Sequence, residues 1–347
     1  MIKEAIEKIV SKQDLTYDEA YTVMNEIMNG ETTQVQNAAY LAALSTKSTK
    51  AETIDEISGS AMAMRDHALK VEHAMDVLDI VGTGGDHAHS INISTTAAMI
   101  IAAAGVKVAK HGNRAASSKC GAADVLEDLG LPLDLKPEAV GEVGDEVGIT
   151  FAFARTFHPA MRFVGPIRAA LGIPCVFNIL GPLTNPANPA HVAIGCANRK
   201  VSPIMAAVYA SRGQSGLVYT SHEGMDELAP TGPVSVWEIR DGKVTETEFD
   251  PTVDLGLAKI TVDQLKGGVP DVNANAFKDF LAGKDITSRT TALLNAASAI
   301  VADGNLVGNG TLAERFAEAY KLAEDAVDSG KAEALFNKWI ETAKSKA

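Results

Sequence analysis

The chain has 347 residues, which suggests one large domain or two modest domains with ample core. Its 31 Lys and Arg against 44 Asp and Glu give a net charge of −13, which disfavours nonspecific nucleic-acid binding and suits a cytoplasmic protein. Three distant cysteines without metal-ligand spacing argue against a disulfide framework or a zinc site, and the longest apolar run, 97–106, is too short to span a bilayer.

Residues 1 to about 70 contain helical patterns only. Ile2, Ile6 and Ile9 fall on one face of a first helix. Three later helices are each expected to open with a capping box, in which Thr and a Glu or Gln three residues on satisfy free backbone N–H groups. These pairs are Thr16 with Glu19, Thr33 with Gln36, and Thr49 with Glu52. No chemical motif lies in this part, so we interpret it as a helical bundle.

A first glycine-rich motif follows the first predicted strand. The short apolar run 77–81 is typical of a buried parallel strand, and it leads directly into GTGGD at 82–86. Glycine reaches positive φ at little cost and lets a ligand approach the backbone. The apolar run 97–104 predicts a helix, with the motif NIST at 92–95 at its start. A strand, a glycine turn and a helix N-terminus form a site for an anion, and phosphate is the expected ligand.

A second motif follows the next predicted strand, 106–109. Lys110, Gly112 and Arg114 leave its end, and Ser117 and Ser118 lead toward a helical pattern at 122–129. These residue types suit a second phosphate, or one end of a pyrophosphate. Because parallel strands place their C-terminal ends on the same side, the two motifs can share one crevice. A tight turn beside solvated charges would explain either motif alone, but it explains two at consecutive strand exits poorly.

Strand and helix patterns alternate through the remaining chain, which predicts an α/β domain with a mostly parallel central sheet flanked by helices. Later strands are expected at 150–153, 192–196, 216–220 and 234–239. Helices are expected at 137–147, 159–171, 203–210, 274–281, 291–303 and 311–329. The proline-rich segment 166–189 interrupts the alternation.

Adjacent acids mark one more candidate site. Asp226 and Glu227 lie in a glycine-flanked loop after the strand at 216–220, and carboxylates suit Mg²⁺. Adjacent acids are usually a solvated surface pair. A nearby pyrophosphate site favours the metal interpretation, because Mg²⁺ neutralises the charge of a pyrophosphate leaving group.

These motifs resemble the anthranilate phosphoribosyltransferase family, within the nucleoside-phosphorylase-like phosphoribosyltransferases. The resemblance rests on GTGGD, NIST and KHGNRAASS, and on the later motifs HPAMR at 158–162, VGPIR at 164–168, FNILGPLTNP at 177–186 and GMDE at 224–227. Ser90-Ile91 and Cys120 depart from the commonest family pattern, Thr-Phe and serine, in a modest way.

The resemblance implies transfer of the phosphoribosyl group of phosphoribosyl pyrophosphate to the amine of anthranilate, a step of tryptophan biosynthesis. It implies Mg²⁺ as cofactor and a homodimer formed through the helical domain. It also implies that 166–189 joins residues 1–70 in a small helical domain, and that 71–165 with 190–347 form the α/β domain that binds phosphoribosyl pyrophosphate.

The site residues follow from the same motifs, with catalysis expected to be electrostatic and positional, because no Ser/His/Asp or Cys/His nucleophile constellation occurs. Phosphoribosyl pyrophosphate is assigned to Gly82, Gly85, Asp86, Ser90, Asn92, Ile93, Ser94, Thr95, Lys110, His111, Gly112, Asn113, Arg114, Ala115, Ala116, Ser117, Ser118 and Ala122. Anthranilate is assigned to Gly82, Asn113 and Arg168. The metal is assigned to Ser94, Asp226 and Glu227, and His158 is a possible lining residue without a role.

Three other classes fit less well. A pyrimidine nucleoside phosphorylase would share the fold but should lack the combination of KHGNR with the acidic pair. A nonenzymatic nucleic-acid-binding relative should carry a basic stripe, whereas this chain is acidic. A dehydrogenase of the Rossmann type needs GxGxxG and an acid about 20 residues later, and neither is present.

Overall fold

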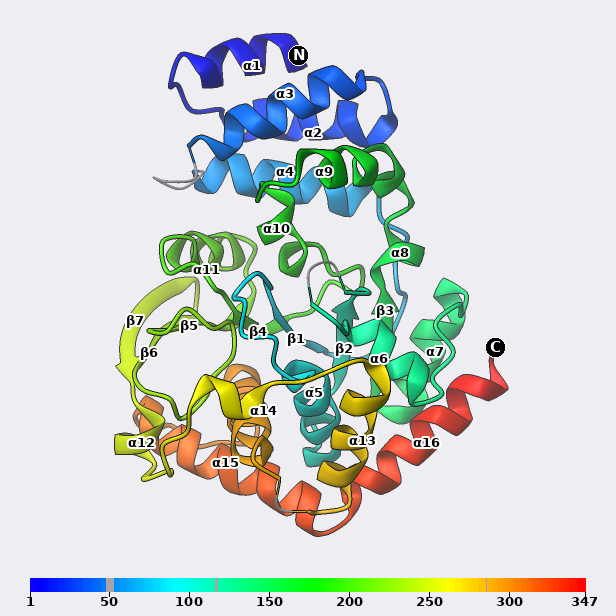
Figure 1. Ribbon diagram of the computed structural model, residues 1–347, viewed down its shortest axis with the longest axis vertical. Coiled ribbons are helices and arrows are strands. Elements are labelled where there is room, and N and C mark those ends of the chain that lie inside the picture. Colours follow the sequence, from blue (N-terminus) through cyan, green and yellow to red (C-terminus); the bar gives the residue numbers. More distant parts are fainter. Residues whose placement is uncertain (48–52, 116–117, 285) are drawn as a thin grey trace.

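The computed structural model describes residues 1–47, 53–115, 118–284 and 286–347. Figure 1 shows a helical part at the top of the view and a larger α/β part below it. The helical part begins with α1 (Ile2–Val10), α2 (Tyr17–Asn29), α3 (Gln34–Ser45) and α4 (Ile54–Asp66). It confirms the helical bundle predicted for the start of the chain.

Two of the three predicted capping boxes are present, and the third was placed one turn too early. Thr16 caps α2 and Thr33 caps α3, each with the reciprocal bond from the third helical residue. Thr49 and Glu52 lie outside the described residues, and α4 opens instead on Thr53 and Glu56. The sequence contains the TxxE pattern twice in succession, and the second copy immediately precedes the buried face of α4.

The sheet has seven strands in the order β3-β2-β1-β4-β5-β6-β7. The strands are β1 (Leu78–Gly82), β2 (Val108–Gly112), β3 (Ile149–Phe153), β4 (His191–Gly195), β5 (Ser215–Ser221), β6 (Val234–Arg240) and β7 (Lys243–Phe249). Neighbours from β3 to β5 pair in parallel, and β6 and β7 are antiparallel additions. The mostly parallel sheet predicted from sequence is therefore confirmed. The chain leaves β1 toward β2 and later returns to its other side as β4, which makes the β1/β4 edge a topological switch point.

Helices cover both faces of the sheet. The principal ones are α5 (Ile93–Ala104), α6 (Ala122–Asp128), α7 (Pro137–Val147), α11 (Ser202–Ser211), α13 (Pro270–Leu281), α14 (Arg289–Asp303), α15 (Leu312–Asp328) and α16 (Lys331–Ser345). α5, α14, α15 and α16 pack on one another below the sheet in Figure 1, whereas α11 lies on the side facing the helical part. The short elements are α8 (Ala154–Phe157), η1 (Pro159–Phe163), α9 (Gly165–Leu171), α10 (Phe177–Leu180), η2 (Pro182–Thr184), α12 (Pro251–Asp254) and η3 (Val262–Leu265).

The prediction of one continuous helix at 159–171 is wrong. It is a 3₁₀ turn, η1, followed by a separate helix, α9, with Val164 between them. Pro166 lacks a backbone N–H and restricts the residue before it, so the helix starts anew around it. α9 packs beside α3, and η2 packs beside α4. The segment around 165–184 thus shares an apolar cluster with the N-terminal helices and with β4 and α11.

Candidate active site

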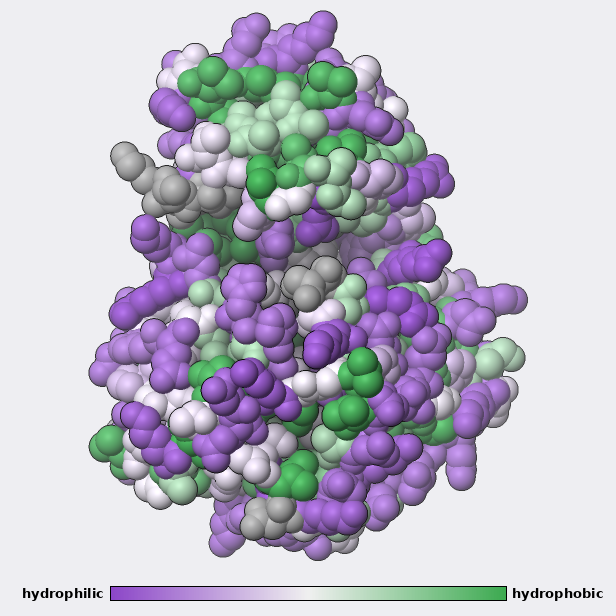
Figure 2. Space-filling model, in the orientation of Figure 1, coloured by the Kyte–Doolittle hydropathy of each residue, from purple (hydrophilic) through white to green (hydrophobic). Residues whose placement is uncertain are grey.

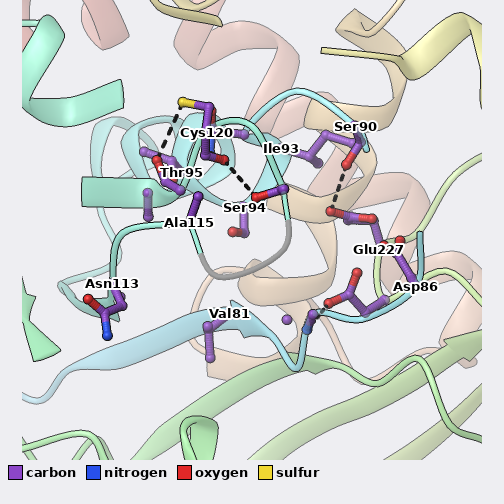
Figure 3. Close-up of a pocket in the computed structure, with 18 of the residues that line it drawn as sticks. Val81, Asp86, Ser90, Ile93, Ser94, Thr95, Asn113, Ala115, Cys120 and Glu227 are labelled. Carbon is purple, nitrogen blue, oxygen red and sulfur yellow. Dashed lines mark hydrogen bonds between the residues drawn. The ribbon is translucent and has the colours of Figure 1, made fainter. Parts of the chain in front are cut away.

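A cavity of about 330 Å³ opens at the carboxyl ends of β1 and β2, next to the switch point of the sheet. The structure brings most of the predicted phosphoribosyl pyrophosphate residues to its wall. These are Gly82, Gly85, Asp86, Ser90, Asn92, Ile93, Ser94, Thr95, Lys110, His111, Gly112, Asn113, Arg114, Ala115, Ser118 and Ala122. Ala116 and Ser117 lie outside the described residues. Figure 3 shows Asp86 and Glu227 on one side of this cavity and Asn113 on the other.

Three carboxylates meet in the cavity wall. Asp86, Asp226 and Glu227 each offer an oxygen within 4.8 Å of the other two. The backbone N–H of Gly84 donates to Asp226 Oδ2 at 2.6 Å. The Ser90 hydroxyl donates to Glu227 Oε1 at 3.2 Å (Figure 3). Asp86 Oδ2 and Glu227 Oε2 are buried without a protein partner. Such unpaired oxygens fit a divalent cation that prefers oxygen ligands.

Burial raises the pKa of two of these carboxyl groups, those of Asp226 and Glu227. Together with the negative charge of Asp86, it raises the pKa of Asp226 to about 7. Burial and the neighbouring Asp226 also raise the pKa of Glu227 well above its ordinary value. Three carboxylates at this spacing repel one another unless a cation or protons compensate them. The sequence placed Asp86 with the phosphate ligands, and only the fold shows its proximity to the acidic pair.

Glycines at two strand ends make room for Asp226. A Cβ at Gly82, the last residue of β1, would overlap Asp226 Oδ2. A Cβ at Gly195, the last residue of β4, would overlap the Asp226 carbonyl oxygen. Any other residue at these positions would displace the acidic loop.

Lys110 is a buried cation rather than a solvated one. Its Nζ donates to the Ile80 carbonyl at 2.6 Å and to Ser94 Oγ at 3.2 Å. Burial lowers the pKa of Lys110 to about 8, and the charge of buried Asp79 on β1 partly opposes this. The hydroxyl of Ser94, predicted as a metal ligand, therefore meets Lys110 in this structure. The two-strand arrangement places a positive charge beside the N-terminus of α5, as an anion site requires.

Arg114 borders the cavity, but its guanidinium is directed to α6. It forms ion pairs with Asp124 at 3.0 Å and with Glu127 at 2.7 Å, and these carboxylates raise the pKa of Arg114. Asp124 Oδ2 also accepts from the N–H groups of Ala115 and Gly121. Asp124 thus organises the loop after β2. Sequence analysis did not identify it, although its position in the first turn of a predicted helix suggests a capping role.

Arg168 does not line the cavity. It lies on α9, half-buried, with its guanidinium carbon 5.4 Å from the ring centre of Phe177. Of the three residues predicted for anthranilate, Gly82 and Asn113 line the cavity and Arg168 belongs to the helical side.

His111 and His158 form a buried pair next to the cavity. Their Nε2 atoms are 3.2 Å apart, and His111 Nδ1 is 3.3 Å from the Gly181 carbonyl oxygen. Burial lowers the pKa of both imidazoles, that of His158 to about 4. Both rings are therefore neutral at pH 7, and the pair links the end of β2 to the segment that packs on the helical part.

This pair is expected to make the protein sensitive to acid. Because the folded pKa of His158 lies below the unfolded value near 6.5, the unfolded state binds more protons between these values. The stabilisation is complete above pH 6.5 and is lost as pH falls toward 4. In urea unfolding, the free energy of unfolding of wild type should fall by about 2 kcal/mol more than that of His158→Gln when the pH is lowered from 7 to 5. The same loss of stability in wild type and in His158→Gln would contradict this expectation. The control is His222→Gln, which replaces an exposed histidine.

Two family models match the chain. The a/b domain of a glycosyl transferase family matches residues 74–333, and the helical bundle domain of a glycosyl transferase family matches residues 3–68. The anthranilate phosphoribosyltransferase of Arthrobacter sp. (strain FB24) is 49% identical over 335 residues, covering 96% of this chain and 94% of that relative. That of Thermobifida fusca (strain YX) is 44% identical over 342 residues, covering 99% of this chain and 97% of that relative. The chain belongs to the anthranilate phosphoribosyltransferase family.

Solved structures of this family have the same fold. The crystal structure of the anthranilate phosphoribosyltransferase of Thermus thermophilus gives a TM-score of 0.89 at 39% identity, covering 98% of this chain and 99% of that one. The Saccharomyces cerevisiae enzyme, described in complex with phosphoribosyl pyrophosphate and Mg, gives 0.88 at 25% identity, covering 99% and 98%. The family and the fold predicted from the motifs are both confirmed.

Proposed function

We propose that this anthranilate phosphoribosyltransferase family member transfers the 5-phosphoribosyl group of phosphoribosyl pyrophosphate to the amine of anthranilate. The products are N-(5-phosphoribosyl)anthranilate and pyrophosphate, and the reaction is a step of tryptophan biosynthesis. The observation that carries the proposal is the cavity itself. It joins a helix N-terminus and a buried lysine, which suit phosphates, to a cluster of three carboxylates, which suits a metal.

The chain's residues bind and align the phosphates. The N-terminus of α5 and the glycine motif present backbone N–H groups, and Lys110 adds a positive charge held by Ile80 and Ser94. Asp86, Asp226 and Glu227 would hold Mg²⁺, the cofactor of the reaction. When bound, Mg²⁺ neutralises charge that develops on the leaving pyrophosphate.

The chemical step needs no protein nucleophile. The bond from ribose C1 to the pyrophosphate oxygen breaks with its electron pair on pyrophosphate, and the anthranilate nitrogen forms the new bond to C1. The nitrogen, positively charged once bonded, then releases one proton to water or to the departing pyrophosphate. The positive charge that develops at the ribose ring and the negative charge on pyrophosphate are stabilised by preorganised groups of the site. The aryl amine is already neutral near pH 7, so the step does not require a strong general base.

The direct test is anthranilate consumption, followed by its fluorescence, with purified protein, phosphoribosyl pyrophosphate and Mg²⁺. We expect loss of the signal only when all three are present. A folded protein that consumes no anthranilate would contradict the proposal, and phosphorolysis of nucleosides would then identify a phosphorylase.

Arg168 is proposed to bind the carboxylate of anthranilate from the helical side. A planar guanidinium matches a carboxylate in two parallel hydrogen bonds. Arg168→Ala is expected to raise the KM for anthranilate roughly tenfold and leave the KM for phosphoribosyl pyrophosphate unchanged, as measured by steady-state kinetics. Arg162→Ala is a matched control, because this arginine lies over Phe163 in the same way. An equal rise in the KM for anthranilate in both variants would contradict the role of Arg168 in binding the carboxylate.

We further propose the domain division 1–70 with 166–189, against 71–165 with 190–347, and a homodimer formed by the helical domain. Packing of α9 on α3 supports the division. Exposed apolar side chains on the helical part support the dimer: Met1, Val10, Tyr17, Val35 and Ile54. Figure 2 shows hydrophobic residues gathered on the helical part at the top of the view. Light scattering should give twice the chain mass of 36.4 kDa.

None of the described helices is both long and apolar enough to cross a membrane. We propose a cytoplasmic location, which membership of a family of biosynthetic enzymes supports.

A further inference from the structure

Asn92 stands at the N-cap of α5, yet its side chain does not cap the helix. Asparagine is among the best N-cap residues, because its side-chain oxygen accepts from an N–H group of the first turn. Here φ is −73° and ψ is 68°, and the Ile93 N–H donates to the Ile91 carbonyl at 2.7 Å, which defines an inverse γ-turn. Within the described chain, no protein group accepts from the N–H groups of Ser94 or Thr95. These donors are open to the cavity.

The amide of Asn92 is held away from its own helix by two other segments. Asn273 of α13 donates from Nδ2 to Asn92 Oδ1 at 2.8 Å. Cys120, in the loop after β2, donates from Sγ to the same oxygen and accepts from Asn92 Nδ2, each at 3.3 Å. Asn273 is itself buried and oriented, because its Oδ1 accepts from the Gly268 N–H at 2.8 Å. The Asn273 amide can therefore present only its N–H group to Asn92.

The segment before α13 is hydrogen-bonded to the loop that precedes α5 in the cavity wall. Ile91 N–H donates to the Leu265 carbonyl at 3.0 Å, and Gly267 N–H donates to the His89 carbonyl at 2.9 Å. A Cβ at Gly267 would lie 2.7 Å from Asn273 Oδ1, so a glycine is needed for this close approach. The loop that carries the start of α5 is thus clamped by residues 265–273, far along the chain.

We propose that Asn273 is a positioning residue for phosphoribosyl pyrophosphate. It keeps the Asn92 amide out of the first turn of α5, so that a phosphate accepts from the Ser94 and Thr95 N–H groups. Without Asn273, the Asn92 side chain is free to cap its own helix and competes with the phosphate for the same donors. The inference rests on the proposed function, whose phosphate subsite it explains.

Asn273→Ala is the first test, with steady-state kinetics for both substrates. The KM for phosphoribosyl pyrophosphate should rise about 5- to 10-fold, while kcat and the KM for anthranilate change less than about twofold. Asn37→Ala is the matched control, because Asn37 is a buried asparagine on α3, bonded to Thr32. The control should lower the melting temperature without changing the KM for phosphoribosyl pyrophosphate. Equal KM changes for both substrates, or the same rise in the control, would overturn the inference.

A second variant guards against loss of folding. Asn273→Asp keeps the size and the acceptor for Gly268, but it cannot donate to Asn92 Oδ1, so the same rise in KM is expected. Recovery of wild-type KM in Asn273→Asp would contradict the inference.

A double-mutant cycle separates competition by Asn92 from a general loss of structure. In an Asn92→Ala background no amide remains that could cap α5. Adding Asn273→Ala to this background should therefore change the KM for phosphoribosyl pyrophosphate by less than about twofold. If Asn273→Ala raises this KM as much in the Asn92→Ala background as in wild type, Asn273 acts in another way.

Binding can be measured apart from the reaction, by calorimetry with magnesium pyrophosphate as the probe. Weaker pyrophosphate binding by Asn273→Ala supports the inference even if wild type consumes no anthranilate, in which case only the proposed function fails. Unchanged pyrophosphate binding, in a wild type that does consume anthranilate, overturns the inference and leaves the function intact.

Discussion

A variant with Asp226→Asn and Glu227→Gln is expected to lose at least about 1,000-fold in kcat/KM, or about 4 kcal/mol of transition-state stabilisation. The two amides keep the size of the side chains but remove two of the three charges that would hold Mg²⁺. Asparagine still accepts from the Gly84 N–H, so the loop should keep its place.

The fold of this variant should be intact or more stable without metal. Burial raises the pKa of both acids, which means that the folded protein disfavours their ionised forms. For Asp226 the stability of the metal-free protein falls as pH rises from its unfolded value near 4 to about 7, and the amide removes this loss. Melting temperatures at pH 7 without Mg²⁺ should therefore be equal or higher in the variant.

Calorimetric titration with Mg²⁺ checks the metal role directly. The variant should bind Mg²⁺ with pyrophosphate at least about tenfold more weakly than wild type. Glu246→Gln with Glu248→Gln, on the exposed strand β7, is a control of equal charge change outside the cavity. Wild-type activity and an unaltered Mg²⁺ titration in the cavity variant would exclude a metal site here.

Gly82→Ala is expected to lower kcat/KM about 100-fold, or roughly 2.7 kcal/mol. The added Cβ would overlap Asp226 Oδ2 and lie 2.7 Å from its Cγ, so the carboxylate must move. Gly82 does not have a positive φ, which means that alanine causes no backbone strain and the effect is steric. Displacement of Asp226 disturbs the proposed metal ligands, and the methyl group narrows the cavity.

Gly232→Ala is the matched control, because its Cβ would meet nothing within 4 Å and its φ is not positive either. This control should keep wild-type kinetics. Kinetics of Gly82→Ala within about threefold of wild type would show that Asp226 moves without consequence, and would argue against its role as a ligand.

Local patterns in the sequence predicted most of the elements that build the cavity. The glycine motif of β1, the start of α5 and the motif after β2 were identified because strands, glycine turns and helix N-termini depend on neighbouring residues. β7 was missed because its side chains are exposed except Phe249, so the apolar alternation of a half-buried strand is absent. α16 was also missed, although Phe336 and Trp339 form its buried face.

Only the tertiary structure decided which of these groups meet. Gly84 and Asp226 are 142 residues apart, and Asn92 and Asn273 are 181 apart, yet each pair is hydrogen-bonded. The first pair lies in the cavity wall, and in the second Asn273 holds the wall residue Asn92 from behind. The direction of the Arg114 guanidinium, toward Asp124 rather than into the cavity, was likewise not determined by its motif. The sequence by itself determined the local backbone, the glycine-rich motifs at the strand ends and the family. The partners of each side chain depend on strand order and helix packing, which bring distant residues together and have no local signature.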